Sequence, residues 1–265
     1  MIDAKVLTIG FDAISKKMSE NRMHLISIDQ QIGDGDLGIS MDNGFKAAAD
    51  VCCANADTAD IGKLLFLAGK SFNEAAPSSL GTIVSMLLID AAKQLKGTEV
   101  IALADFGNII HKSMSSIMEK LDSKLGEKTF FDAVVPAAKA LCEEGVVSDK
   151  QRLKNAAEAA RNGVESTRDM VAKHGRAAYF GEKTLGSIDG GAEAGRIIFE
   201  AIVQYIRSMR IFYAKSLLQS SDMSIAEVAE KVGVKSASHF SKIFENEVGE
   251  SPSKFRKSYF DRNHS

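Results

Sequence analysis

Apolar residues recur at helical spacing along most of the first two hundred residues of the chain. The pattern begins with Val6, Ile9, Phe11, Ile14 and Met18 and recurs at 41–53, 61–72, 83–95, 103–121, 130–142, 153–171 and 192–209. Stretches that alternate apolar and polar residues are missing from the sequence, and only 3 prolines interrupt it. We therefore expect an all-α fold, an antiparallel barrel or bundle of about eight helices with functional loops at one end.

The first of these loops, residues 29–38, concentrates negative charge. It reads DQQIGDGDLG and places the three carboxylates of Asp29, Asp34 and Asp36 within eight positions, interleaved with glycines that let the backbone turn sharply. Hard oxygen ligands of this kind suit Mg²⁺, which takes a few carboxylates together with water and substrate phosphates. The loop therefore predicts a magnesium site.

This aspartate loop has two other possible interpretations, a calcium-binding loop and a solvated acidic turn. A calcium-binding EF-hand loop that began at Asp34 would need glycine at its sixth position and glutamate at its twelfth. Those positions hold Ile39 and Phe45, which excludes that motif. A solvated acidic turn, in which aspartate and glycine serve only turn formation, stays open at this stage.

Three further loops combine glycine with polar residues, at 75–82, 126–132 and 175–191. The first opens a helix, so its hydroxyls and amide N–H groups can bind an anion, although an ordinary capped helix start fits equally well. The five histidines are scattered and show no spacing typical of a catalytic or metal-binding pair.

Length and composition limit the class of protein. The 265 residues suffice for one large domain and a small appendage, and 45% of them are hydrophobic. Cys52, Cys53 and Cys142 lack metal-ligand spacing, and their odd number favours a reducing compartment. Since no uncharged run is long enough to span a membrane, we expect a cytoplasmic protein without a membrane partner.

The end of the chain differs in charge and pattern. From Ile206 onward ten lysines and arginines face seven acids, a net charge of +3 against about −5 for the rest. The segment Ser224-Ile225-Ala226-Glu227 forms a capping box that starts a short helix at 225–232. Gly233 supplies a turn, and Ser236 can cap a second helix. This spacing fits a helix-turn-helix, although a helical hairpin used for packing or dimerisation stays open.

The second helix carries its polar residues outward, at Ser238, His239, Ser241 and Lys242. Residues 207–265 resemble the C-terminal half of an AraC-type DNA-binding domain, through words such as IAEVA, VGV, SHF and GESP. The resemblance implies DNA contacts from the start and outer face of this helix, at Lys235, Ser236, Ser238, His239, Ser241 and Lys242. Only one of that family's two helix-turn-helix units is present, so we expect modest, salt-sensitive affinity for DNA.

Residues 1–206 resemble the nucleotide-binding subunit of dihydroxyacetone kinases, the DhaL family. The matching words are IGDGD with the preceding Asp29, then SLGT, GEKT and GRA, and all stand in the family's order. The resemblance implies an eight-helix barrel that binds ATP or ADP with two Mg²⁺ ions held by Asp29, Asp34 and Asp36. It further implies nucleotide contacts at Ser78, Ser79, Gly81, Thr82, Thr129, Phe130 and Arg176.

The resemblance also implies partners. The family's triose-binding subunit is absent from this chain, so a kinase would need it as a separate protein. The phosphate donor would be free ATP or a phosphocarrier protein that acts on bound ADP, and we expect a homo-oligomer. The chain departs from the family at Leu37, at 73–77 and at Gly190. A regulator whose kinase-like domain senses nucleotide or a partner is the alternative function.

Overall fold

The computed structural model describes residues 1–145, 148–234 and 236–263, and these residues form helices without any named strand. A single isolated bridge joins Ile2 to Ile101. The helices are α1 (Ala4–Ile32), α2 (Leu37–Ala54), α3 (Ile61–Ala75), α4 (Ser79–Gln94), α5 (Leu103–Lys120), α6 (Phe130–Cys142), α7 (Asp149–Ser166), the 3₁₀ segments η1 (Thr167–Asp169) and η2 (Arg176–Thr184), α8 (Gly190–Ser220), α9 (Ile225–Lys231), α10 (Ala237–Val248) and α11 (Pro252–Asn263). The expected all-α fold is confirmed.

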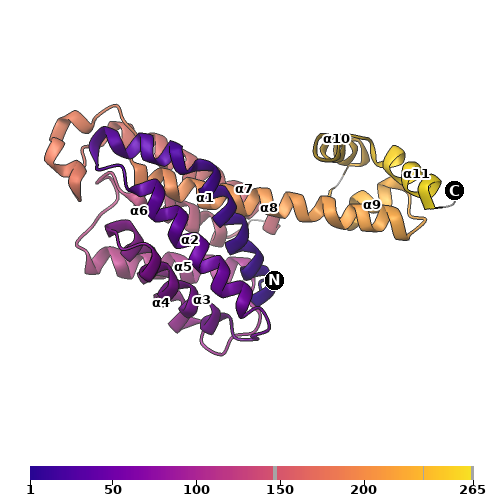
Figure 1. The fold of residues 1–265 in the computed structure, drawn as a ribbon, viewed down its shortest axis with the longest axis horizontal. Coiled ribbons are helices and arrows are strands. Elements are labelled where there is room, and N and C mark those ends of the chain that lie inside the picture. Colours follow the sequence, from indigo (N-terminus) through magenta and orange to yellow (C-terminus); the bar gives the residue numbers. More distant parts are fainter. Residues whose placement is uncertain (146–147, 235, 264–265) are drawn as a thin grey trace. The chain divides into compact units, whose positions relative to one another are not determined.

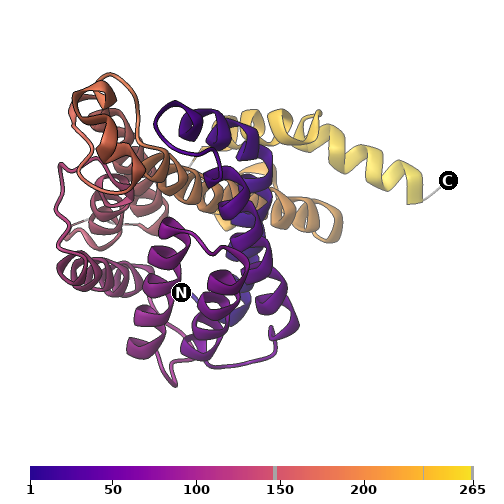
Figure 2. The same cartoon turned by 60° about the vertical axis from the view of Figure 1, so that its left-hand side comes forward.

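The first seven helices pack in chain order, each against the next, and they lie side by side in both views (Figures 1 and 2). The beginning of α8 closes the arrangement. Its Glu193 pairs with His24 of α1, and its Gly195 packs closely against Val134 of α6. Consecutive antiparallel helices joined in this way bring alternate loops to the same end of the bundle.

Local sequence explains where individual helices begin. The side chain of Asp60 accepts a hydrogen bond from Lys63 N and starts α3, whose Ile61, Leu64 and Phe72 are fully buried. In α6 the side chain of Thr129 and Asp132 form a capping box. This helix spans the residues that hydrophobic spacing predicts for it.

Some boundaries differ from the sequence prediction. Helices α2 and α4 start one turn earlier than predicted, at Leu37 and Ser79, and the side chain of Ser78 caps α4. Helix α7 ends at Ser166 rather than near 171, where the chain passes into η1. Helix α8 continues past 209 to Ser220.

The chain divides into two compact units, Met1–Val203 and Gln204–Ser265. In the second unit the end of α8 and the short helices α9, α10 and α11 enclose a small apolar core (Figure 1). Its fully buried centre includes Phe240 and Phe244, and Arg256 donates hydrogen bonds to the carbonyl oxygens of Leu218 and Met223. The predicted capping box of Ser224 and Glu227 starts α9.

Within the described residues, none of the helices is both long enough and apolar enough to cross a membrane.

Candidate functional site

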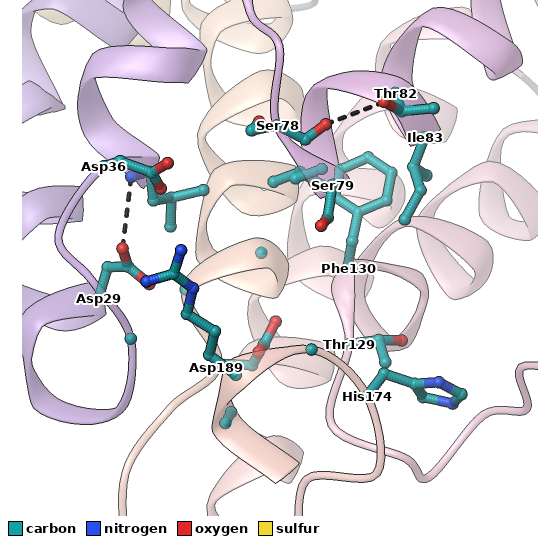
Figure 3. Close-up of a pocket in the computed structure, with 18 of the residues that line it drawn as sticks. Asp29, Asp36, Ser78, Ser79, Thr82, Ile83, Thr129, Phe130, His174 and Asp189 are labelled. Carbon is teal, nitrogen blue, oxygen red and sulfur yellow. Dashed lines mark hydrogen bonds between the residues drawn. The ribbon is translucent and has the colours of Figure 1, made fainter. Parts of the chain in front are cut away.

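Loops from one end of the helical bundle line a pocket of about 880 Å³. Its walls come from the α1–α2, α3–α4 and α5–α6 loops and from the segment between α7 and α8. Figure 3 shows Asp29 and Asp36 on one side, Ser78, Ser79 and Thr82 along another wall, and Thr129 with His174 opposite the aspartates. The pocket is large enough for a nucleotide-sized ligand.

The three predicted metal ligands come together in this pocket. One carboxylate oxygen from each of Asp29, Asp34 and Asp36 lies within 4.8 Å of the others. Asp29 Oδ2 accepts hydrogen bonds from Gly35 N at 2.8 Å and Leu37 N at 3.3 Å, which folds the loop around it. Gly35 has a φ of +78°, a conformation that glycine adopts without strain. The three oxygens can therefore face one cation.

The charges in this cluster are only partly neutralised. Arg176 Nη1 lies 2.8 Å from Asp34 Oδ2. Burial, followed by the negative charges of Asp34 and Asp29, raises the pKa of Asp36, whereas the charge of Arg176 opposes that rise. The three carboxylates repel one another, and the charge of Arg176 offsets only part of their negative charge. They therefore form a suitable oxygen donor set for a divalent metal.

The predicted anion-binding loop lies at the start of α4. Ser78 Oγ accepts a hydrogen bond from Gly81 N at 3.1 Å and caps the helix, and Thr82 Oγ1 donates to Ser78 O at 3.0 Å. Ser79 is exposed within the pocket. Helix α4 therefore begins at the pocket wall, where its first N–H groups and the positive end of its dipole favour an anion.

Gly81 differs from the other predicted contacts, since it is buried and is not among the residues that line the pocket. A side chain at this position would collide with the carbonyl oxygen of Ala76. Close backbone packing beneath the loop therefore accounts for a glycine at this position, and its nucleotide contact stays a prediction.

Thr129 and Phe130 line the side of the pocket opposite the aspartates. The hydroxyl of Thr129 accepts a hydrogen bond from Phe131 N, and Asp132 accepts from the amides of Thr129 and Gly126 at 2.7 and 2.6 Å. These polar groups hold the α5–α6 loop in shape, while the aromatic rings supply an apolar surface.

Lys128, which has no role that its local sequence indicates, connects two loops through hydrogen bonds. It is 3% exposed, and its Nζ donates to the carbonyl oxygens of Thr167 at 2.5 Å and Ser187 at 2.6 Å. Burial lowers the pKa of this amine, and the charge of Asp189 opposes the shift. Lys128 thus anchors the segment between α7 and α8 beside the pocket.

Asp189 and His174 are further pocket residues that sequence spacing did not reveal. Burial raises the pKa of Asp189 to about 7, despite a hydrogen bond from Ala192 N and the charge of Lys128. His174 Nε2 lies 2.6 Å from Glu127 Oε2. The His174–Glu127 contact and the effect of the Lys128 charge on Asp189 join residues far apart in the chain, so no local motif could have indicated them.

The second unit presents the predicted polar face of its helix-turn-helix. Ser236, Ser238, His239 and Lys242 are exposed on α10 or at its N-cap, and Ser241 is partly exposed. Lys235 lies outside the described residues. On the same helix Glu245 and Glu247 are exposed, so positive charge is limited to its first half.

Comparison with protein families identifies both parts of the chain. A model described as the DAK2 domain matches residues 31–204, and one described as a helix-turn-helix domain matches residues 200–258. The first match begins two residues after Asp29 and contains the other pocket loops.

Curated relatives resemble the first part of the chain. The ADP-binding subunit DhaL of the PEP-dependent dihydroxyacetone kinase 1 of Listeria innocua is 29% identical over 189 residues, covering 71% of this chain and 90% of the relative. The corresponding Escherichia coli subunit is 29% identical over 171 residues, covering 64% and 81%. The L-erythrulose 1-kinase of Mycolicibacterium smegmatis is 28% identical, covering 77% of this chain but only 36% of that enzyme.

A solved structure shares the fold. The dihydroxyacetone kinase of C. freundii, determined in complex with AMP-PNP and Mg²⁺, superposes with a TM-score of 0.60 at 21% identity. The match covers 77% of this chain and 34% of that kinase. The chain therefore spans about a third of the solved enzyme.

Proposed function

Because the chain belongs to the DAK2 domain family, we propose that residues 1–206 bind a magnesium complex of ADP or ATP and act as the phosphoryl-transfer subunit of a dihydroxyacetone (glycerone) kinase-like system. The observation that carries this proposal is the cluster of Asp29, Asp34 and Asp36 in the same pocket as the start of α4. A cation site and an anion site side by side suit a metal-bound polyphosphate.

We propose that the three aspartates hold two Mg²⁺ ions. Bound magnesium would supply positive charge that neutralises the negative charge developing during phosphoryl transfer. Ser79, Thr82 and the first amides of α4 would bind the phosphates, and Arg176 would add positive charge from the opposite loop. In such reactions the protein mainly positions the phosphates and excludes water.

The acceptor must come from outside this chain. Relatives of similar extent are named as ADP-binding subunits. We therefore propose a separate triose-binding subunit that presents a small hydroxyketone or related sugar, as the names of the dihydroxyacetone and erythrulose kinases suggest. These relatives are named as subunits of PEP-dependent kinases, which favours a phosphocarrier protein as the donor to bound ADP.

Isothermal titration of the full chain with ADP tests the proposal. We expect binding that requires Mg²⁺, disappears with a chelator, and weakens at least about tenfold in Asp34→Asn, since each such metal contact is charge-assisted. Asp42→Asn is the matched control, because this α2 carboxylate pairs with Arg22 outside the pocket. If ADP fails to bind, or binds Asp34→Asn as tightly as wild type, the proposed function is wrong.

The helix-turn-helix favours a second function for residues 207–265, which is DNA binding that tunes transcription. The supporting observation is the exposed set Ser236, Ser238, His239 and Lys242 at the start of α10. Backbone N–H groups at a helix start and a nearby lysine suit phosphate contacts, and exposed polar side chains suit base edges. In this case the pocket would sense nucleotide or a partner.

Fluorescence anisotropy of the full chain with duplex DNA from upstream of its own gene tests this second function. We expect measurable binding at low salt that falls steeply as salt rises and weakens several-fold in Lys242→Ala. Lys112→Ala removes an exposed lysine of α5 and serves as the control. A full chain without affinity for this DNA at low salt would rule out the regulator.

A further inference from the structure

Ser123 is a pocket residue whose hydroxyl is unused. The residue is 7% exposed and lines the pocket, yet its Oγ has no hydrogen-bond partner, the only buried side-chain oxygen or nitrogen of the described residues in that state. Buried polar atoms normally have a partner, because leaving one unpaired has an appreciable free-energy cost. Because Ser123 also lines the pocket, a bound ligand can supply the partner that this buried hydroxyl lacks.

The backbone fixes Ser123 in this position. Helix α5 ends in a Schellman motif, in which Ser123 N donates to Met118 O at 2.9 Å and Asp122 N donates to Glu119 O at 3.3 Å. Asp122 takes the left-handed conformation, with φ of +47°, that glycine usually occupies in this motif. The motif turns the chain so that Ser123 follows the helix end directly into the pocket wall.

The surroundings of Ser123 suit the base of a nucleotide. Its own loop contributes Leu121, Phe130 and Phe131 to the pocket lining, whereas the carboxylates and Arg176 come from other loops. Figure 3 shows Thr129 of this loop on the side away from Asp29 and Asp36. If phosphates lie between the aspartates and α4, the base lies over the apolar side.

Other polar side chains on this side are already engaged. Lys128 Nζ donates to two carbonyl oxygens, and Thr129 Oγ1 takes part in the cap of α6. A base has flat faces that pack on apolar side chains and an edge that carries hydrogen-bond donors and acceptors. Ser123 Oγ can both donate and accept, so it can pair with that edge.

We propose that Ser123 is a nucleotide-binding residue whose hydroxyl forms a hydrogen bond with the edge of the purine base. This inference rests on the proposed function, since it assumes that the pocket takes ADP or ATP. It gives the α5–α6 loop a role in recognising the base, separate from the metal and phosphate contacts on the opposite side.

Titration calorimetry of the full-length Ser123→Ala variant with ADP and Mg²⁺ tests the proposal. Loss of one net hydrogen bond predicts that Kd for ADP rises about fivefold. The melting temperature without nucleotide should stay equal or rise, because the substitution removes an unpaired buried hydroxyl. Ser113→Ala is the control, since this buried α5 serine accepts a hydrogen bond from Gln94 outside the pocket, and its Kd for ADP should not change.

Ligand fragments then assign the contact. Magnesium pyrophosphate, which lacks the nucleoside, should bind Ser123→Ala and wild type equally. The fivefold loss should persist with 2′-deoxy-ADP and 3′-deoxy-ADP, because a base contact and a sugar hydroxyl act independently. Equal ADP affinity in wild type and Ser123→Ala overturns the proposal, as does a loss that vanishes with either deoxy analogue. Wild-type protein that binds no ADP at all would instead remove the proposed function itself.

Discussion

Arg176 and Asp34 form an ion pair at the pocket, with 2.8 Å between Nη1 and Oδ2. The two residues come from the 3₁₀ segment η2 and the aspartate loop, which the chain separates by more than a hundred positions. The proposed Mg²⁺ ion would need the same carboxylate. Under that proposal, Arg176 would compete with the free metal ion but favour a bound polyphosphate.

We expect Arg176→Ala to have opposite effects on these two ligands. Affinity for Mg²⁺ alone should rise about fivefold, since a nearby positive charge disappears, whereas affinity for ADP in saturating Mg²⁺ should fall several-fold. Calorimetric titrations measure both values. Arg22→Ala, which removes a similar ion pair with Asp42, is the control. A lower affinity for both ligands would mean that Arg176 does not compete with the metal.

Asp189 predicts an unusual dependence of stability on pH. Burial raises the pKa of this carboxyl to about 7 in the folded chain, from 3.8 for an unperturbed aspartate. Between these values the folded state binds more protons than the unfolded state, so the contribution of Asp189 to stability falls as pH rises from about 4 to about 7. Asp189→Asn removes this loss.

Melting temperatures of wild type and Asp189→Asn at pH 5 and pH 8 measure the effect. The melting temperature of the variant minus that of wild type should be more positive at pH 8. Asp12→Asn is the control, because it changes an exposed carboxylate that pairs with Lys16 outside the pocket. A difference for Asp189→Asn that is the same at both pH values contradicts the assigned shift.

The parts of this protein that sequence predicts are those set by local spacing. Asp29, Asp34 and Asp36 lie within eight residues, so one glycine-rich turn suffices to gather them. Helix α6 begins at a capping box and carries continuous apolar spacing, which fixes both ends. Apolar spacing predicts a helix at 192–209, but no glycine or proline stands between Gly195 and Gly233, and α8 continues to Ser220.

The remaining site residues depend on how the bundle closes. Ser123 and Asp189 lie outside the matching words, and Lys128, although part of GEKT, acts through its contact with a distant loop. Gly81 belongs to a recognisable motif, but that motif does not reveal its close packing against Ala76. Residue spacing along the chain predicts which residues are neighbours within one helix or turn. Which loops meet in the pocket depends on the tertiary packing of the helices.

Glu193 should be one of the most sensitive charged positions in the first unit. It is 3% exposed, accepts two hydrogen bonds of 2.7 Å from Arg196, and lies 2.8 Å from His24 Nε2. Burial raises its pKa, but the hydrogen bonds and charges of Arg196 and His24 outweigh burial and hold the pKa below its usual range. The stability it contributes is therefore lost as pH falls through that lowered pKa.

Glu193→Gln should lower the free energy of unfolding by about 2 kcal/mol at pH 7, because the partly buried Arg196 loses the charge of its bidentate partner, although it keeps its ion pair with Glu200. Urea titration followed by circular dichroism measures this value. Glu165→Gln breaks an exposed pair with Arg168 of similar length, 2.8 Å, and should cost less than about 1 kcal/mol. Equal effects of the two substitutions would show that burial of Glu193 adds nothing to its ion pairs.

Gly163 permits close packing of α7 against the start of α6. A Cβ atom at this position would lie 2.7 Å from Ala133 Cα and would collide with the carbonyl oxygen of Asp132, the residue that caps α6. Alanine favours helix formation over glycine by about 1 kcal/mol, so helix propensity and packing oppose each other here. Because the obstructing atoms belong to the backbone, they cannot turn aside as a flexible side chain would.

We therefore expect Gly163→Ala to destabilise the protein by about 1–3 kcal/mol in urea titrations. Gly10→Ala is the matched control within α1, where no heavy atom outside the local helix lies within 4 Å of the added Cβ, and it should stabilise by about 0.5–1 kcal/mol. Since Asp132 also holds Thr129 and Gly126 in the pocket loop, Gly163→Ala should weaken ADP binding as well. If Gly163→Ala stabilised the protein as Gly10→Ala does, α6 and α7 could move apart without a cost in free energy. The packing at Gly163 would then not hold the pocket loop in place.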